Sequence, residues 1–343
     1  MLRPYFFRRS MRRFFFLSFL TLFIAGLSAC GWLAWYVFSP VAGSGEVLVA
    51  IPKGAGVRDI KTMLAKKGVI RDDLRFLVLM RLLREIERQD PPTLRAGEFL
   101  VPLGLTPLQV IRFLHQAKTV QHWVTIPEGL TMRQIAAIFA KDGWADAAVF
   151  LRLCQDYDFI RSLGIKADSL EGYLFPETYS VVRGETNERG LISRMTRRFF
   201  TVWNNLAKPA DLRLNQHELL TLASIIEKET GSAGERELIA GVFYNRLRRG
   251  MRLQSDPTVI YGIPDFNGNL TRADLRAATP YNTYTISGLP PGPICNPGQA
   301  ALEAALRPAE VSYLYFVSKN DGSHQFSRTL KEHNRAVRRY QRQ

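Results

Sequence analysis

The chain has 343 residues, of which 46% are hydrophobic and 22% charged, and its formal net charge is +15. This length and apolar content suit two or three domains with hydrophobic cores, which excludes a wholly disordered chain. The strong positive charge suits an anionic partner, which could be nucleic acid, lipid headgroups or a wall polymer.

The first element is a basic tail at residues 1–13, followed by an uncharged apolar run at residues 14–38. About 20 apolar residues suffice for a transmembrane helix. Because five arginines precede the run, the positive-inside rule predicts a single-pass inner-membrane protein with a cytoplasmic N-terminus and a periplasmic remainder. Leu27-Ser28-Ala29-Cys30 also matches a lipoprotein cleavage box, in which Cys30 would be lipidated. The apolar run continues past Cys30, which favours an uncleaved anchor.

Without the five arginines the exported part keeps a charge of +10 (15 minus 5). Export argues against nucleic acid as the partner. Cys30, Cys154 and Cys295 are too few and too dispersed for a disulfide framework, although a Cys154–Cys295 bridge stays an alternative to two buried thiols. The five histidines show no metal-ligand spacing, so neither a metal nor a cofactor is predicted.

An internal repeat follows the linker at residues 39–45. VAIPKGAGVRDIKTMLAKKG from Val49 matches VTIPEGLTMRQIAAIFAKDG from Val124 at an offset of 75, with nine identities in twenty positions. Each copy predicts a short strand, a Pro-x-Gly turn and an amphipathic helix that ends at a glycine.

Residues 46–118 contain the first copy, a charged amphipathic helix at residues 72–88 and a strand at residues 98–102. The order strand–helix–helix–strand is typical of LysM-type modules. Such a βααβ module could bind N-acetylglucosamine chains or could only position a catalytic domain, and both interpretations stay open.

A mixed α+β catalytic domain is predicted at residues 119–343, with the second repeat copy at residues 122–143. In SLEGYLFPETY, aromatic and acidic side chains alternate, which predicts a short strand and turn. Aromatic faces stack on sugar rings and carboxylates accept hydrogen bonds from hydroxyls, so Glu171, Tyr173 and Glu177 are candidate substrate contacts. An ordinary core-edge strand is the alternative.

The predicted catalytic helix spans residues 215–230. Its apolar residues cover more than half of the circumference, so we expect it to be largely buried, with Glu227 and Glu229 in its last turn. A carboxylate there is paired, solvated or used in chemistry, and the helical wheel does not choose between the two.

The remaining polar candidates lie downstream of this helix. A helix at residues 233–249 carries Asn245, a turn precedes Pro257, and a rigid Pro/Gly loop at residues 288–293 follows an aromatic-rich segment. A helix capped by Asn296 and an Asn-Asp-Gly hairpin complete the chain. The candidates for substrate binding in these segments are Asn245, Gln254, Asp256, Tyr281, Asn282 and Tyr284.

From about Val47 to the C-terminus the sequence resembles the YceG-like (MltG) endolytic murein transglycosylases. The resemblance rests on ordered motifs, which are EGYLFPETY, ASIIEKET, RLRRGMRLQSDPTVIYG, TPYNTYTISGLPPGPICNPGQAALEAAL and YLYFVSKNDGSHQFSRTLKEHN. It implies a LysM-like module, a YceG-like catalytic domain and a catalytic acid/base at Glu227, whereas Glu229 is given no catalytic role.

The resemblance also implies the reaction and the partners. A lytic transglycosylase breaks the MurNAc–GlcNAc bond of nascent glycan strands and leaves anhydro-MurNAc ends, which terminates strand growth. One glutamate suffices, because a hydroxyl of the substrate itself attacks. Peptidoglycan is the implied substrate, and penicillin-binding synthases and elongation machinery are the implied partners.

Three alternatives are weighed against this reading. A hydrolysing muramidase would pair Glu227 with Glu229, Asp256 or Glu171. A serine hydrolase would use Ser224 and Lys228, although no nucleophile-elbow pattern supports it. A non-catalytic LysM-type wall-binding protein would need neither glutamate.

Overall fold

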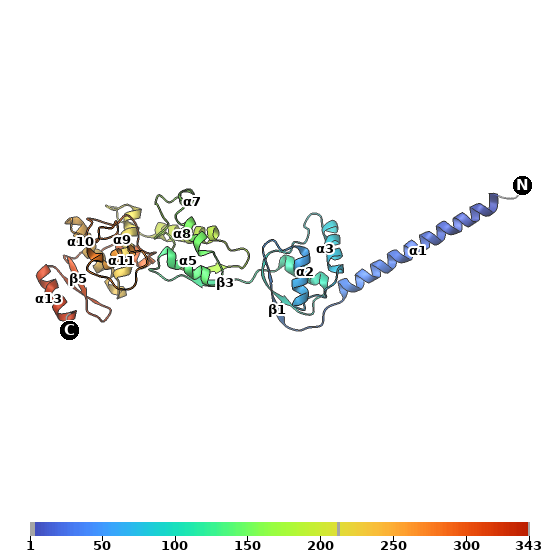
Figure 1. Ribbon diagram of the computed structural model, residues 1–343, viewed down its shortest axis with the longest axis horizontal. Helices are drawn as coiled ribbons and strands as arrows, with labels where there is room; N and C mark the ends of the chain where they lie inside the picture. Colours follow the sequence, from blue (N-terminus) through green and yellow to red (C-terminus); the bar gives the residue numbers. More distant parts are fainter. Residues whose placement is uncertain (1–3, 211–212, 342–343) are drawn as a thin grey trace. The chain divides into compact units, whose positions relative to one another are not determined.

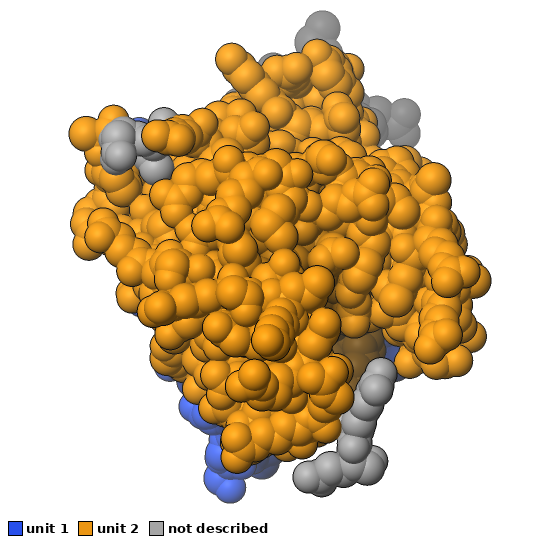
Figure 2. All heavy atoms as spheres, turned by 90° about the vertical axis from the view of Figure 1, so that its left-hand side faces the viewer, with its two compact units in different colours: residues 1–122, 181–185 blue, residues 123–180, 186–343 orange. Residues whose placement is uncertain are grey.

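The protein forms two compact units in the computed structural model, which describes residues 4–210 and 213–341, with side chains from Phe14 onward. The first unit comprises Met1–His122 and Val181–Glu185, and the second comprises Trp123–Ser180 and Thr186–Gln343 (Figures 1 and 2). The class is α+β, as the sequence predicted.

The first unit begins with a long helix, α1 (Pro4–Phe38) (Figure 1). Its segment Phe14–Phe38 has a mean hydropathy of 2.0, so that by length and composition it qualifies as a membrane span. The last turns of α1 differ from the rest of that segment because Tyr36 and Val37 are buried in the hydrophobic core of the first unit. The apolar helix is therefore continuous with a folded unit.

The rest of the first unit is a two-stranded antiparallel sheet packed against helices. Strand β1 (Glu46–Ile51) pairs with β2 (Gly97–Pro102), with Glu46 opposite Pro102. Between the strands lie α2 (Val57–Lys66) and α3 (Arg75–Ile86), and α4 (Pro107–Gln116) follows. The strand–helix–helix–strand order is confirmed, whereas the assignment to the LysM class stays a prediction, as does the boundary between residues 118 and 119.

The second copy of the repeat folds as the first copy does. Strand β3 (His122–Thr125) leads into α5 (Met132–Lys141). The turn glycine has φ +83° at Gly54 and +76° at Gly129, values that glycine adopts without strain. The repeat and its strand–turn–helix structure are therefore confirmed.

The second unit is mainly helical and is built around its helix α9 (Gln216–Glu229). This helix packs against α10 (Arg236–Arg248), α11 (Asp256–Tyr261) and α12 (Gln299–Leu306). Its short strands form two small pairs, β3 with β4 and β5 with β6. The remaining elements are α6 (Ala147–Leu153), α7 (Tyr157–Ser162), β4 (Thr178–Val181), α8 (Glu188–Asn205), η1 (Ala233–Glu235), η2 (Asp274–Arg276), β5 (Tyr315–Ser318), β6 (His324–Ser327) and α13 (Leu330–Tyr340).

Three local predictions need correction. The strand expected from Glu171 begins only at Thr178, and the residues before it form buried turns. Asn296 does not cap a helix, because α12 begins at Gln299 and Gly298 is its N-cap. The segment expected as a turn before Pro257 is instead the start of α11, with the proline in its first turn.

Candidate active site

Glu227 lies in the last turn of α9, a helix that is buried on all sides. Every residue from Leu219 to Ile226 is buried, and Asn215 starts the helix with a capping box that Glu218 completes. Glu227 is the first residue after this run that reaches the surface, because its side chain is only partly covered. Helix α9 thus holds one carboxyl group at the edge of a rigid core.

Two loops meet beside Glu227. The loop after β3 and the loop before α12 form an isolated antiparallel bridge, in which Gly129 N donates to Asn296 O at 2.9 Å and Asn296 N donates to Leu130 O at 2.8 Å. Gly298 N then donates to Glu227 Oε2 at 3.1 Å. A Cβ atom added at Gly129 would lie 3.6 Å from Glu227 Cγ, so the first loop passes close beside the glutamate.

Hydrogen bonds within a cluster of buried polar groups fix the positions of the two loops. The side chain of Asn296, which is fully buried, accepts from Leu174 N at 2.8 Å and donates to Glu171 Oε1 at 2.9 Å. Glu171 also accepts from Met132 N at 3.0 Å and from the hydroxyl of Tyr261 at 3.1 Å. These bonds connect four separate segments of the second unit.

Burial raises the pKa of Glu171 to about 7, against the lowering effect of the hydrogen bonds that it accepts. Its carboxyl group is 2% exposed and faces inward. Glu171 therefore supports the loops that flank Glu227 and is not open to a polymer from outside.

The carboxyl group of Glu128 lies close to Gly298, the residue that donates a hydrogen bond to Glu227. A Cβ atom built on Gly298 would lie 1.9 Å from Glu128 Oε1, which means that this carboxylate rests on the glycine that hydrogen-bonds Glu227. The sequence analysis did not single out Glu128. The repeat carried a signal, since Lys53 stands at the corresponding position of the first copy.

The surroundings of Glu227 favour its protonated form. Burial raises the pKa of Glu227 and the charge of Glu128 raises it further, whereas the Gly298 hydrogen bond and the charges of Arg236 and Lys228 lower it. Lys228 Nζ itself donates to Gly129 O at 3.4 Å. A partly exposed acid with a raised pKa is the feature expected of a general acid.

Glu229 has a different environment from Glu227. Its Oε1 accepts a hydrogen bond of 2.6 Å from Ser255 Oγ, and Asp256 lies close enough to raise its pKa, in addition to the larger effect of burial. The guanidinium of Arg246 lowers the pKa of Glu229. The two glutamates of the motif thus point into separate polar clusters, and Glu229 has a side-chain partner within the fold.

Several predicted substrate residues have side chains that are engaged inside the second unit. Tyr173 is buried and hydrogen-bonds His217 Nδ1 at 2.9 Å. The amide of Asn245 donates to two backbone carbonyls near β5, and that of Asn282 donates to three near η2. Glu177 pairs with Arg198 at 2.8 Å. Their contact with substrate stays a prediction beside these structural roles.

Other predicted residues keep exposed atoms. Gln254 is exposed and has a positive φ of +49°, and its backbone N–H donates to Thr283 O. Asp256 is exposed and accepts from the hydroxyl of Tyr284 at 2.6 Å. Tyr281, which is partly exposed, packs its ring against Tyr261 at 4.8 Å. Of these residues, Asp256 and Tyr284 lie near Glu229, since, in addition to the larger effect of burial, the charge of Asp256 raises the pKa of Glu229 and that of Glu229 raises the pKa of Tyr284.

The serine of the hydrolase alternative is enclosed. Ser224 is fully buried, donates to Thr221 O at 2.7 Å and accepts from Ile294 N at 3.0 Å. Both hydrogen-bonding directions of its hydroxyl are therefore used. The two cysteines of the second unit, Cys154 and Cys295, are free and buried.

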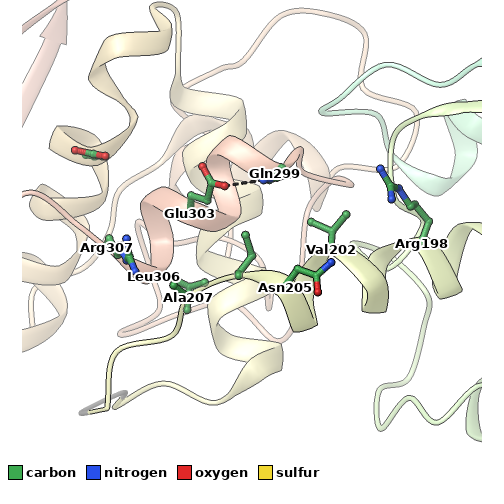
Figure 3. Close-up of a pocket in the computed structure, with 10 residues that line it drawn as sticks. Arg198, Val202, Asn205, Ala207, Gln299, Glu303, Leu306 and Arg307 are labelled. Carbon is green, nitrogen blue, oxygen red and sulfur yellow. Dashed lines mark hydrogen bonds between the residues drawn. The ribbon is translucent and has the colours of Figure 1, made fainter.

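A polar hollow lies beyond α12, between it and α8 (Figure 3). Its wall includes Arg198 and Glu303, and Glu303 accepts a hydrogen bond of 2.7 Å from Gln299. Glu227 is not among its lining residues. Within the described residues no group of histidine, cysteine, aspartate or glutamate side chains is arranged to hold a metal ion.

Glu227 combines a raised pKa, partial exposure and a fixed backbone donor, which makes it the candidate general acid of this site. Comparison with known proteins identifies the family. The sequence model of the YceG-like family matches residues 49–339.

Similar proteins carry a shared name. The chain is 34% identical to an endolytic murein transglycosylase of Bacillus subtilis (strain 168) over 313 residues, which cover 86% of this chain and 84% of that protein. It is 33% identical to an endolytic murein transglycosylase of Streptococcus pneumoniae (strain ATCC BAA-255 / R6), covering 94% of this chain and 64% of that one.

A solved structure agrees with these matches. The crystal structure of a yceG-like protein from Listeria monocytogenes superposes with a TM-score of 0.58 at 34% identity, covering 85% of this chain and 98% of that one. The chain belongs to the YceG-like family, which confirms the resemblance expected from its motifs.

Proposed function

We infer that this chain is an endolytic murein transglycosylase, a lyase that cuts the glycan strands of peptidoglycan internally. The similar proteins of that name support the activity. The observation that carries the chemistry is the position of Glu227, a carboxyl group with a raised pKa at the exposed end of a buried helix, with a backbone N–H on one of its oxygens.

Glu227 acts twice in the proposed reaction. It first donates its proton to the oxygen that links MurNAc to GlcNAc, and the C–O bond breaks as positive charge develops on the MurNAc ring. A hydroxyl of the same MurNAc then attacks that carbon, and the Glu227 carboxylate takes the hydroxyl proton. The protons balance, no water is consumed, and the product ends in anhydro-MurNAc.

The neighbours of Glu227 suit both halves of this cycle. Before bond cleavage, burial and the charge of Glu128 keep the proton on Glu227. After proton transfer, the Gly298 N–H and the charge of Lys228 stabilise the carboxylate. These opposed effects bring the pKa of the acid closer to the working pH, which is the condition for efficient acid–base catalysis.

Within the predicted substrate set, we propose direct sugar contacts first for Gln254, Asp256, Tyr281 and Tyr284, because these four side chains are exposed or partly exposed. The side chains of Glu171, Tyr173, Asn245 and Asn282 hold segments of the second unit together, so a substrate contact at these residues would be additional to that structural role.

We further propose that α1 anchors the protein in the inner membrane, with its N-terminus in the cytoplasm and both units in the periplasm. The supporting observation is the apolar segment Phe14–Phe38, and the arginines before it give the orientation. Cutting nascent strands near the membrane would terminate their growth. Penicillin-binding synthases and elongation machinery are the partners that family resemblance suggests.

Two matched substitutions test the role of Glu227. Glu227→Gln preserves the size of the side chain but cannot donate a proton, so turnover of glycan strands should fall by about 10²–10⁴-fold with little change in thermal stability. Glu229→Gln should be clearly milder in activity, because the role assigned to Glu229 is structural. A Glu227→Gln loss below about tenfold is too small for the sole proton donor, and the reverse order of the two variants would transfer the role to Glu229.

The nearness of Glu128 favours one second candidate, a hydrolysing muramidase. Hydrolysis uses a second carboxylate as base or nucleophile, and Glu128 lies against Gly298, the glycine that hydrogen-bonds Glu227. The two candidates differ in their products, since a muramidase leaves reducing ends.

A further inference from the structure

Helix α3 of the first unit has an apolar stripe on its outer face. Leu74, at its N-cap, is 69% exposed, Val78 is 44%, Leu82 is 42% and Ile86 is 76% exposed. The spacing of four residues places these side chains along one side of the helix. On the adjoining, buried side of the helix, Phe76, Leu79, Met80 and Leu83 face the core.

Helix α3 carries more apolar side chains than its packing against the core of the first unit requires. A surface helix normally has a polar outer face opposite its buried stripe. At 100° per residue the exposed stripe adjoins the buried one, so that apolar side chains cover well over half of α3. Exposed Glu85 lies in the same sector of the helix, so the stripe is apolar apart from one acid. Four exposed large apolar side chains along one side of a helix are the feature expected of an interaction site.

The stripe begins beside the end of α1. The guanidinium of Arg75 donates to Trp32 O at 2.9 Å and lies 4.8 Å from the centre of the Trp32 ring, while Arg71 lies 5.1 Å from the Trp35 ring. Figure 1 shows α3 on the side of the first unit from which α1 leaves it. The two helices are thus fixed to each other at this end.

The length of α1 sets the depth at which this contact lies. The hydrocarbon core of a bilayer is about 30 Å thick and needs about 20 helical residues. Counted from Phe14, such a span ends at Leu33, between the two tryptophans that contact α3. Tryptophan is enriched at the membrane–water boundary, so the start of α3 lies at the level of the outer headgroups.

The charges around the stripe favour anionic headgroups. Asp73 pairs with Arg75 and Glu85 with Arg88, while Asp72 and Glu87 pair with basic residues outside α3. Among the described residues, Arg81 and Arg84 have no acidic partner within ion-pair distance. Both line a groove beside the stripe, whose other charged residues are Arg58, Asp59 and Glu85, so its lining carries three positive and two negative side chains. Exposed cations beside an apolar face are typical of helices that lie on anionic membranes.

We propose that α3 lies on the outer surface of the same membrane that α1 crosses, with its stripe in the boundary between headgroups and acyl chains and with Arg81 and Arg84 on anionic lipid phosphates. The first unit would then be held against the bilayer at two places. This inference rests on the proposed anchoring by α1, and it assigns to α3 a membrane-binding role beyond that of a scaffold.

The test places an environment-sensitive fluorophore on the full-length protein in nanodiscs of phosphatidylethanolamine and phosphatidylglycerol. A Cys30→Ser background leaves only the two buried native thiols, and Leu82→Cys introduces the labelling site. We expect blue-shifted emission and several-fold stronger quenching by spin-labelled lipid than at the control Leu100→Cys. Leu100 belongs to the same unit and is 47% exposed, close to the 42% of Leu82.

A third label, Leu22→Cys, reports on α1 itself. Quenching at residue 22 without quenching at residue 82 overturns the docking of α3 while leaving the anchor in place, and quenching at neither residue overturns both. A further variant separates the stripe from chance proximity. Leu82→Asp with Ile86→Asp, in protein labelled through Val78→Cys, should abolish quenching at residue 78, and quenching that persists there contradicts the proposal.

Discussion

At the scale of single residues, burial is the largest effect that keeps the proton on Glu227, and the charges of Glu128 and Lys228 adjust its pKa in opposite directions. One neighbour is negative and raises the pKa of Glu227, and the other is positive and lowers it. A general acid works only while it is protonated, so the alkaline limb of the pH–rate profile follows this pKa. Each neighbour can therefore be tested by the direction in which its removal moves that limb.

Glu128→Gln removes a negative charge, which lowers the pKa of Glu227 and should shift the alkaline limb of kcat/KM to lower pH. Lys228→Met removes a positive charge and should shift the same limb to higher pH. The measurement is the pH dependence of strand cleavage by the two variants and the wild type. Shifts in the same direction, or no shift, would contradict the electrostatic role given to Glu128.

The sequence predicted Glu227 but not Glu128, and the reason is physical. The burial of the helix that ends near Glu227 can be read from its local apolar pattern, and the choice of Glu227 over Glu229 came from the family resemblance of the motif. Glu128 reaches the site through the bridge between two loops that are far apart in the chain. Side-chain neighbours created by such a long-range contact leave no periodic signal. Only the difference between Lys53 and Glu128 in the repeat pointed to this position.

At the scale of elements, the loop before α12 matters because Gly298 supplies the hydrogen bond to Glu227. Asn296 fixes that loop by bonds to Leu174 and Leu130 backbone atoms and to Glu171. The sequence predicted Asn296 as a helix cap because Pro297 follows it. Its amide instead connects three distant segments, an arrangement that local spacing cannot predict.

Asn296→Ala should destabilise the second unit and weaken catalysis together. It leaves the buried Leu174 N–H without its acceptor and Glu171 without one donor, for a cost of roughly 2–5 kcal/mol. Urea unfolding gives the stability, and strand cleavage at a temperature where the variant is folded gives the activity. Gln299→Ala, at an exposed neighbouring position, is the control and should change stability by less than about 0.5 kcal/mol. If the Asn296→Ala variant were as stable as this control, the role of Asn296 in fixing the loop before α12 would be contradicted.

Elements with strong local signals were predicted well. Both repeat copies, the helix that carries Glu227 and the hairpin with its Asn-Asp-Gly turn appear where periodicity and glycines place them. The stretch from Glu171 to Phe175 was predicted poorly, since its alternation of aromatic and acidic residues imitates a strand. Those side chains are buried in several directions, which a chain of turns permits and a half-exposed strand does not.

At the scale of the whole molecule, the proposed anchor is joined directly to a folded unit. Helix α1 continues into the core of the first unit through Tyr36 and Val37, so an anchor would hold that unit without a flexible tether between them. The second unit carries Glu227, and residues 181–185 of the chain return from it to the first unit. A lipoprotein cleaved at Cys30 would keep only the last turns of α1.

The uncleaved anchor can be tested by mass spectrometry of the intact protein extracted from membranes with detergent. We expect a chain that keeps residues 1–38 and an unmodified Cys30, because the apolar segment is long enough to span and continues past that cysteine. A chain that begins at a diacylglyceryl-modified Cys30 would establish the lipoprotein interpretation instead.

The central claim is that Glu227 alone transfers the protons while the substrate supplies its own nucleophile. It is tested most directly by digesting glycan strands in heavy-oxygen water and measuring the masses of the new ends. The account predicts anhydro-MurNAc ends without heavy oxygen from the wild type, and their loss in Glu227→Gln. Reducing ends that carry heavy oxygen would contradict it, because they require water as the nucleophile and would make the enzyme a muramidase.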